Sequence, residues 1–237
     1  MTYIYLIISV LISVLFVSIN KPNKKFTQWL LSFSGAYLLS MTISHLLPET
    51  FGILEIENHH HHNSEAINVK LIGSFILLGI IIQLVLESFS KGAEHGHVHI
   101  HNHKKEFPWM LFASLCIHAF SEGIPLGYKN NQSFLWAIVI HKIPVGIVLT
   151  SFFFKHNYNI KKIVFFMLTF ALMSPLGSLL ASKIHFFQHY QNYITAIIIG
   201  IFLHISTVIL FESSENHKFS FPKFIAILLG MSIALLS

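Results

Sequence analysis

Three residues whose side chains can bind a metal ion, His118, Glu122 and His141, lie inside segments that are apolar enough to cross a membrane. An ionisable side chain at bilayer depth is costly, so such residues usually face protein or a water-filled path and serve a function. Two imidazole nitrogens and one carboxylate oxygen suit a borderline divalent ion such as Zn²⁺. The combination predicts a protein that moves a metal ion through a membrane.

The spacing of these residues brings them together. His118 and Glu122 are four residues apart, so in a helix they share one face about one turn apart. The link to the next apolar segment, from Tyr128 to Ser133, is short and predicts two antiparallel neighbouring helices. At about 1.5 Å per residue, His118 lies roughly 15 Å below this link and His141 roughly 12 Å below it. Both helices therefore bring ligands to nearly the same depth.

Prolines accompany the candidate ligands. Pro125 and Pro144 have no N–H, so each frees the backbone carbonyl four residues before it, close to Glu122 and His141 respectively. Pro175 repeats this arrangement in a later segment. Interrupted helices are tolerated at bilayer depth where they face a cavity or packed protein, and transporters often use them at binding sites. The alternative is that these prolines only shape the bundle.

The composition indicates a membrane protein. Of 237 residues, 54% are hydrophobic and 11% are charged, and the mean hydropathy is +0.65, too apolar for a soluble domain of this length. We predict an all-α fold, a polytopic membrane helical bundle with about eight transmembrane helices in a single domain, residues 1–237. A membrane-crossing helix needs roughly 20 apolar residues, so the first and last segments are short. The predicted spans are 3–19, 27–47, 69–89, 108–128, 133–154, 162–182, 191–211 and 219–236.

The lysines predict the orientation. Most of the 15 basic residues lie in alternate connections, and positively charged connections stay in the cytoplasm, so both termini should lie outside. The pI near 9.3 then reflects lysines that face anionic lipid, with no nucleic-acid partner. A chain rich in Lys, Ile, Phe and Asn but without arginine is typical of an AT-rich bacterial source, which predicts the bacterial cytoplasmic membrane. The lysines that give this pattern are Lys21, Lys24, Lys25, Lys91, Lys104, Lys105, Lys155, Lys161, Lys162, Lys218 and Lys223.

Two connections are rich in histidine. The outer one, residues 48–68, combines four glutamates with the run His59–His62. The inner one, at about 91–106, alternates histidines with other residues, and we predict a flexible cytoplasmic loop that binds metal loosely as a buffer or sensor. A solvated linker without an essential role is the alternative. The loop histidines are His95, His97, His99, His101 and His103.

Three short motifs point to a family. Span four contains His118–Gly127 (HAFSEGIPLG), span five contains His141–Gly146 (HKIPVG), and span two ends with His45–Glu49 (HLLPE). With about eight spans, outer termini and a histidine-rich loop between spans three and four, the chain resembles the ZIP (Zrt/Irt-like) divalent metal transporters over nearly its whole length. The resemblance implies that the three ligands named above bind the transported ion. It also implies that one group of helices moves against another to alternate access.

The chain departs from the family pattern at three positions. Many relatives hold a second metal ion with a polar residue after the span-four histidine and with acids in span five. Here Ala119, Lys142 and Val145 stand at those places. Alanine and valine cannot bind a metal, and an ammonium has no lone pair to offer. We therefore predict one transported ion per site, with the Lys142 charge standing roughly where a second cation would be. A structural ion pair between Lys142 and Glu122 is the alternative, and both hold in turn if metal binding displaces the pair.

Further polar residues predict the rest of the path. His45 and Glu49 lie one turn apart at the outer end of span two, which fits metal capture, while His204 and Glu212 share roughly one face of span seven, which fits release. For each, a helix-packing or interfacial role is the alternative, and Glu87 is expected to reach cytoplasmic water. The pathway candidates are His45, Glu49, Lys142, Ser174, His204 and Glu212.

These observations predict a transporter of divalent metal ions, with Zn²⁺ uptake into the cytoplasm first and Fe²⁺, Mn²⁺ or Cd²⁺ as further substrates. We expect no enzymatic activity and no bound cofactor; the partners are metal ions and the lipid bilayer, and a homodimer is left open. A cation-diffusion exporter normally has about six spans and a soluble C-terminal domain, whereas this chain ends at Ser237 directly after a span. A membrane-embedded zinc hydrolase or a metal sensor would also use such ligands, although the chain has no His-Glu-x-x-His pair.

Overall fold

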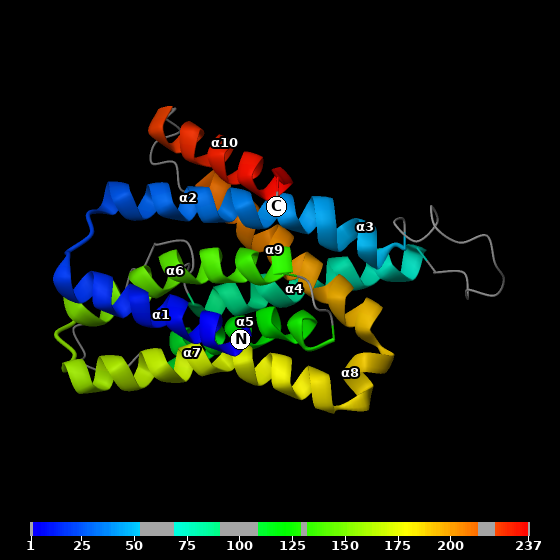
Figure 1. Ribbon diagram of the computed structural model, residues 1–237, viewed down its shortest axis with the longest axis horizontal. Helices are drawn as coiled ribbons and strands as arrows, with labels where there is room; N and C mark the ends of the chain where they lie inside the picture. Colours follow the sequence, from blue (N-terminus) through cyan, green and yellow to red (C-terminus); the bar gives the residue numbers. More distant parts are fainter. Residues whose placement is uncertain (1, 53–68, 91–108, 129–131, 213–220, 237) are drawn as a thin grey trace.

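The computed structural model describes residues 2–52, 69–90, 109–128, 132–212 and 221–236. Over these ranges the regular structure is helical, without a strand, and the long helices lie side by side in one bundle (Figure 1). The all-α prediction is therefore confirmed. The long helices are α1 (Thr2–Ile19), α2 (Lys24–Met41), α4 (Val69–Ser90), α5 (Trp109–Gly123), α6 (Gln132–Lys155), α7 (Ile160–Lys183), α9 (Gln191–Glu212) and α10 (Phe221–Leu236). The short elements are the π-helical turn η1 (Thr42–Leu46), α3 (Leu47–Thr50), the 3₁₀ turn η3 (Ile124–Gly127) and α8 (His185–His189).

Seven of the described helical segments are long and apolar enough to cross a membrane. Their bounds agree with the predicted spans to within a few residues, because lysines and polar residues interrupt the apolar runs at each end. The last helix, α10, is apolar but has 16 residues, or about 24 Å at 1.5 Å per residue, against a hydrocarbon core of about 30 Å. The eighth crossing remains a prediction.

The prolines act differently in different helices. Before Pro48, α2 continues through the π-helical turn η1 into α3, which accommodates a residue that cannot donate. At Pro125 the α-helix ends and the chain continues as the 3₁₀ turn η3, so the predicted interruption near Glu122 is present. In contrast, α6 and α7 remain helical through Pro144 and Pro175.

The helices form two groups. Helices α1, α5, α6 and α7 pack on one another around a shared apolar cluster that includes Val10, Leu115, Val145 and Phe170. We call these four helices the site group. In the second group, which we call the facing group, α10 packs on α2, α4 packs on α9, and α2 packs on α9. The groups meet where α2 lies against α6 and α4 against α5.

Within the site group, α5 and α7 approach each other closely at the level of the candidate ligands. A Cβ added to Gly123 would overlap the Ser174 carbonyl oxygen, and one added to Gly177 would overlap that of Phe120. Only residues without a side chain permit this approach. The Ser174 hydroxyl completes the contact by donating to the Ala119 carbonyl at 2.5 Å. The turn of α5 that carries the ligands is therefore fixed on α7.

Candidate metal site

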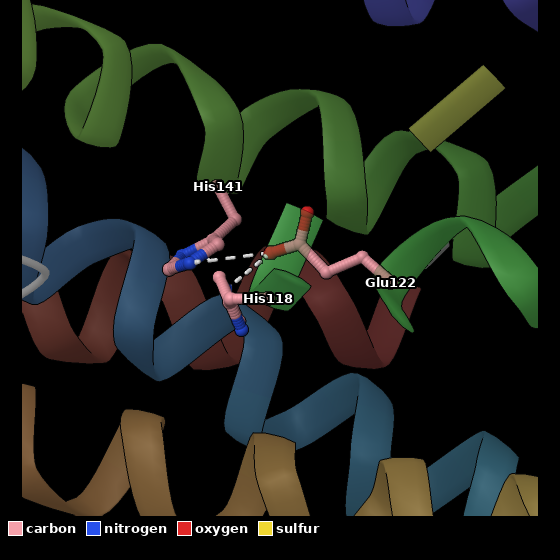
Figure 2. Close-up of side chains that lie close together, drawn as sticks. All are labelled: His118, Glu122 and His141. Atoms are coloured by element: carbon pink, nitrogen blue, oxygen red, sulfur yellow. Dashed lines mark ion pairs between the residues drawn. The ribbon is translucent and has the colours of Figure 1, made fainter. Parts of the chain in front are cut away.

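The three predicted ligands lie together between α5 and α6 (Figure 2). One ligand atom from each of His118, Glu122 and His141 can be chosen so that all lie within 4.8 Å of one another. Each residue is at most 2% exposed. In the part of the chain that the structure describes, no other group of three His, Cys or carboxylate side chains is gathered in this way.

The carboxylate of Glu122 faces both imidazoles with one of its oxygens. Its Oε1 lies 2.6 Å from His118 Nε2 and 3.8 Å from His141 Nε2. The two rings are edge-on, with centroids 6.1 Å apart. In a tetrahedral zinc site with bonds of about 2.0–2.2 Å, ligand atoms lie roughly 3.3–3.6 Å apart. Small side-chain rotations would therefore seat an ion among these three atoms.

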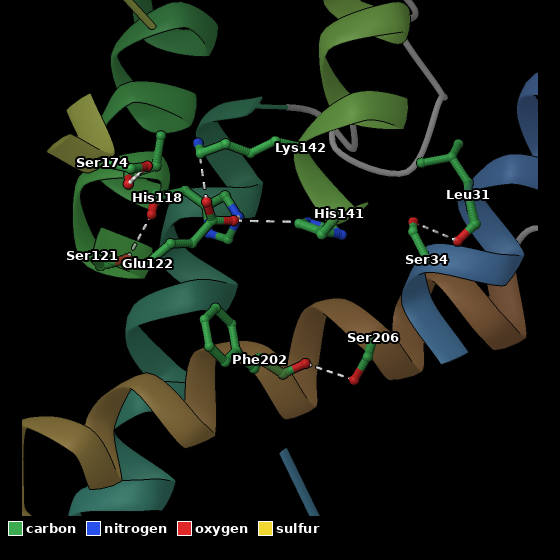
Figure 3. Close-up of polar contacts among 11 residues, drawn as sticks. Leu31, Ser34, His118, Ser121, Glu122, His141, Lys142, Ser174, Phe202 and Ser206 are labelled. Carbon is green, nitrogen blue, oxygen red and sulfur yellow. Dashed lines mark hydrogen bonds and ion pairs between the residues drawn. The ribbon is translucent and has the colours of Figure 1, made fainter. Parts of the chain in front are cut away.

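The second oxygen of Glu122 faces a buried lysine (Figure 3). Lys142 Nζ lies 3.1 Å from Glu122 Oε2, and Lys142 is 1% exposed. The same ammonium stands 4.7 Å from the centroid of the Phe170 ring, a distance at which a cation is attracted to an aromatic face. The ion pair that we gave as the alternative role of Lys142 is thus present in this structure. The residues at the other two departures from the family pattern, Ala119 and Val145, are buried in the same apolar cluster as Phe170.

Helix α1 contacts the part of α6 that carries His141 and Lys142. Ser13 of α1 donates its hydroxyl to the carbonyl of Ile143, at 2.9 Å, between Lys142 and Pro144. A Cβ added to Gly146 would lie 2.7 Å from that same hydroxyl oxygen, so α1 approaches α6 closely one turn below His141. Helix α1 therefore braces α6, a role that the apolar sequence of α1 does not reveal.

The predicted close packing of α5 against α6 is wrong at the level of the helix backbones, because other helices pack on each of them. The main helix contacts of α5 are with α7 and α4, and those of α6 are with α1 and α2. Across the site, the two helices face each other through the side chains of His118, Glu122, His141 and Lys142. The equal-depth prediction is confirmed for these side chains.

Two of the pathway candidates, Lys142 and Ser174, contact the turn of α5 that carries the ligands, whereas His45, Glu49 and His204 do not belong to the three-ligand cluster. His45, in η1, and Glu49, in α3, are half-buried. Ser174 is fully buried on α7, and its hydroxyl bonds the backbone beside His118. Glu212 ends α9, and its side chain lies outside the described residues, as does the whole of loop 91–106 with its five histidines.

Glu87 has a partner that the sequence does not indicate. Its Oε2 lies 3.5 Å from His204 Nδ1, with side chains 20% and 13% exposed respectively. Its expected contact with cytoplasmic water stays a prediction. The two residues link α4 to α9 within the facing group. Sequence patterns miss the pair because the residues are 117 positions apart and no motif joins them.

A second contact missed from the sequence joins the two helix groups. Tyr128 directly follows η3, and its hydroxyl shares a hydrogen bond of 2.8 Å with the Thr195 hydroxyl of α9. Because Thr195 lies in the first turns of α9, the end of η3 and the start of α9 lie together, and α3, which carries Glu49, also packs on α9.

Comparison with known proteins gives consistent results. The profile of the ZIP zinc transporter family matches residues 90–237. "Zinc transporter ZIP1" of Danio rerio is 28% identical over 146 residues, which cover 59% of this chain and 42% of that protein. "Protein zntD" of Dictyostelium discoideum is 31% identical over 110 residues, covering 40% of this chain and 16% of that protein. "Zinc transporter ZIP1" of Plasmodium falciparum is 23% identical over 262 residues, covering 84% and 73% respectively.

Two of the relatives are much longer than this chain, and all three come from eukaryotes. The chain spans less than half the length of the zebrafish and Dictyostelium relatives. The predicted bacterial source finds no support, because these relatives come from eukaryotes. Seven membrane-length apolar helices within the described ranges show an integral membrane protein. The match to more than half of the residues establishes that the chain belongs to the ZIP zinc transporter family, a family of transporters.

Proposed function

We propose that this protein carries divalent metal ions, Zn²⁺ first among them, into the cytoplasm through the site formed by His118, Glu122 and His141. The observation that carries the proposal is the convergence of two imidazoles and a carboxylate, all buried, at the middle of two membrane-length helices. Ionisable groups are held at that depth only at a cost, which a transport function explains. Zn²⁺ prefers this mixture of ligands, whereas Fe²⁺, Mn²⁺ and Cd²⁺ are further substrates that it would accept.

The number of ligands suits transport. A structural zinc site closes four protein ligands around the ion, but three leave one position for water. An ion held in this way keeps a route for exchange and can leave when the path opens. The proposed site therefore binds strongly enough to dehydrate the ion in part and weakly enough to release it.

Lys142 supports one ion per site. An ion bound to the Oε1 side of Glu122 would leave the Oε2 side to the ammonium, which lies 3.1 Å away. The neighbouring Ala119 and Val145 side chains contain no atom that could bind a metal. If the incoming ion draws Glu122 away, the ring of Phe170 offers the ammonium a second favourable contact. Lys142 would then pair with Glu122 when the site is empty and stand in for a second cation when an ion is bound.

The two helix groups suggest how access alternates. All four charged or ligating residues of the site belong to α5 and α6, within the site group, while α2, α4 and α9 form the wall that faces it. Close backbone approaches join α5 to α7, and the Ser13 side chain joins α1 to α6, so the site group can move as one body. We propose that this body moves against the facing group and exposes the ion to each side in turn.

The topology follows the lysine distribution. We propose eight crossings in a single domain, residues 1–237, with both termini outside and the short α10 as the last crossing. Contacts along α4 and α9 fit this: Gly79 meets Ile197 and Glu87 meets His204, so the two helices run in the same direction, as the third and seventh crossings must.

The proposed path places His45 and Glu49 at the outer mouth and Ser174 beside the site. Toward the cytoplasm it continues past His204 and Glu212 to the histidine-rich loop, which would buffer or sense the released metal. Two copies could pair in the bilayer as a homodimer.

Uptake of Zn²⁺ into vesicles containing the purified protein tests the proposal. Wild-type protein should accumulate Zn²⁺, and the His118→Ala and Glu122→Gln variants should not. His156→Ala is the matched control, because this exposed histidine lies in the connection between α6 and α7, far from the site in sequence. A hydrolase or a sensor would give no protein-dependent uptake, and an unimpaired His118→Ala variant would refute the assigned site.

A further inference from the structure

We propose that His185 and His189 on α8 form a second, peripheral site for divalent ions of the Zn²⁺ class. The two residues are four positions apart on one helix, so their side chains emerge on the same face. Their ring centroids lie 5.9 Å apart and the rings are nearly parallel, with an angle of 18° between their planes. Two imidazoles that share a tetrahedral ion at about 2.0–2.1 Å hold their centroids roughly 5 Å apart. Both side chains are exposed, so a small rotation of each closes this difference.

The backbone beneath this histidine pair is held in place. Phe187, between the two histidines, packs against the apolar core. The side-chain amide of Gln188 donates to the Ser182 carbonyl at 2.8 Å, and the backbone N–H of Ile184 donates to the Leu180 carbonyl at 2.9 Å. Binding an ion then orders only two side chains, which lowers the entropic cost of chelation.

The pair lies at the end of the bundle where the proposed path begins. Helix α8 leads directly into α9, whose first residue, Gln191, accepts a hydrogen bond of 3.5 Å from the Tyr128 hydroxyl. Tyr128 is six residues beyond Glu122, which corresponds to roughly 9–12 Å along the helix. In Figure 1, α8 and α3, which carries Glu49, lie at the same end of the bundle. In the proposed orientation this end is the outer one.

We therefore infer that the pair collects ions near the outer mouth; this role rests on the proposed function, whereas the binding itself does not. Two ligands give a weak site, and the nearby exposed Lys183 weakens it further. Weak binding suits capture, because an ion held tightly at the periphery would not proceed to the buried ligands. A purely interfacial α8 is the competing explanation, since Phe186 and Tyr190 are exposed aromatic residues of the kind that anchor at a membrane surface.

Metal binding can be measured at this location alone. A fluorophore on an introduced cysteine at exposed Asn192, in a His118→Ala, Cys116→Ser background, would be quenched at short range by Co²⁺ bound to the pair. We expect saturable quenching by Co²⁺ that His185→Gln/His189→Gln abolishes and that either single change weakens about tenfold, because the second ligand acts at high effective concentration. Equal quenching with and without the pair would overturn the proposed site.

Uptake then tests the capture role. In the otherwise wild-type protein, His185→Gln/His189→Gln should raise the KM for external Zn²⁺ by about threefold or more and leave the maximal rate unchanged. His156→Gln, which removes one exposed histidine from the connection between α6 and α7, should change neither value. Quenching without a change in KM would overturn the capture role. Persistent uptake by His118→Ala would instead refute the function proposed above and leave the quenching result unaffected.

Discussion

Replacing Lys142 with methionine should tighten metal binding and slow transport. In the metal-free protein, the ammonium is the counter-charge of Glu122, at 3.1 Å. When a divalent ion binds Glu122, the ammonium becomes a neighbouring like charge. Methionine has a similar length and no charge, so it removes the repulsion while filling the space beside Phe170. This expected gain in metal affinity is opposite to the effect of removing a metal ligand, which weakens binding.

The structure gives the size of this effect. An ion bound to Glu122 Oε1 at about 2.0–2.2 Å would lie roughly 5–6 Å from Lys142 Nζ. Charges of +2 and +1 at that separation repel by about 6 kcal/mol at an effective dielectric constant of about 20. Movement of the ammonium toward Phe170 relieves part of this repulsion. We therefore expect at least a tenfold gain in affinity, or about 1.4 kcal/mol.

The assay is equilibrium Zn²⁺ binding to full-length protein, together with uptake into vesicles. We also expect the histidine-rich loops to bind metal, so the His118→Ala and His118→Ala/Lys142→Met variants supply the backgrounds to subtract. Uptake by Lys142→Met should show a lower KM and a lower maximal rate, since an ion that is held more tightly leaves more slowly. Lys142→Arg keeps the charge and should keep the affinity near that of the wild type.

An unchanged or weaker Zn²⁺ affinity in Lys142→Met would refute the proposed repulsion between the bound ion and the Lys142 ammonium. It would mean that the ammonium moves out of range when metal binds, or that the ion does not use Glu122. Binding by Glu122→Gln separates these outcomes, because a retained affinity there would exclude Glu122 as a ligand.

The same geometry makes four further predictions. Glu122→Gln should reduce Zn²⁺ uptake to the background of empty vesicles, since it removes the only formal negative charge among the three proposed ligands; uptake near the wild-type rate would contradict this. Uptake should fall as the pH drops from 7.5 to 5, because free imidazoles protonate near pH ~6.5 and the protonated rings cannot bind metal; a flat profile would count against histidine ligands. Gly123→Ala should lower the free energy of unfolding by about 1–3 kcal/mol, because the added Cβ would meet the Ser174 carbonyl. Gly73→Ala should have little effect on it, because nothing lies within 4 Å of the added Cβ. Lys142→Glu should raise the bound metal by one ion per site, measured by elemental analysis, and an unchanged stoichiometry would exclude the idea that Lys142 replaces a second ion.

The sequence predicted the helices well because hydropathy reports membrane crossings directly. Among the described residues, seven apolar runs are long enough to cross, and lysines or polar residues bound them, so α4 and α9 begin at the predicted residues. The convergence of the three candidate ligands was predictable for a different reason. The short link after Tyr128 sets the relative depth of two helices, which brings His141 nearly level with His118.

Helix neighbours were not predictable in the same way. In lipid, every face of a membrane helix is apolar, so hydropathy does not show which face meets protein. The bracing of α6 by Ser13, the contact of Lys142 with Phe170 and the pairing of Glu87 with His204 all depend on neighbours distant in the sequence. Phe170 is one of 23 phenylalanines, and nothing in its local sequence distinguishes it.

In the proposed mechanism, the buried Lys142 also affects the step in which the empty site moves back after it has released its ion. With neutral imidazoles, the carboxylate of Glu122 and the ammonium of Lys142 sum to zero charge. A moving group of helices that carried Glu122 alone would bring an unpaired charge past the apolar wall of the facing group, at a cost of several kcal/mol. The ion pair removes that cost only when the site is empty, because a bound divalent ion adds two positive charges. Loss of Lys142 should therefore slow the return of the empty site as well as the release of the ion, and both effects lower the maximal rate.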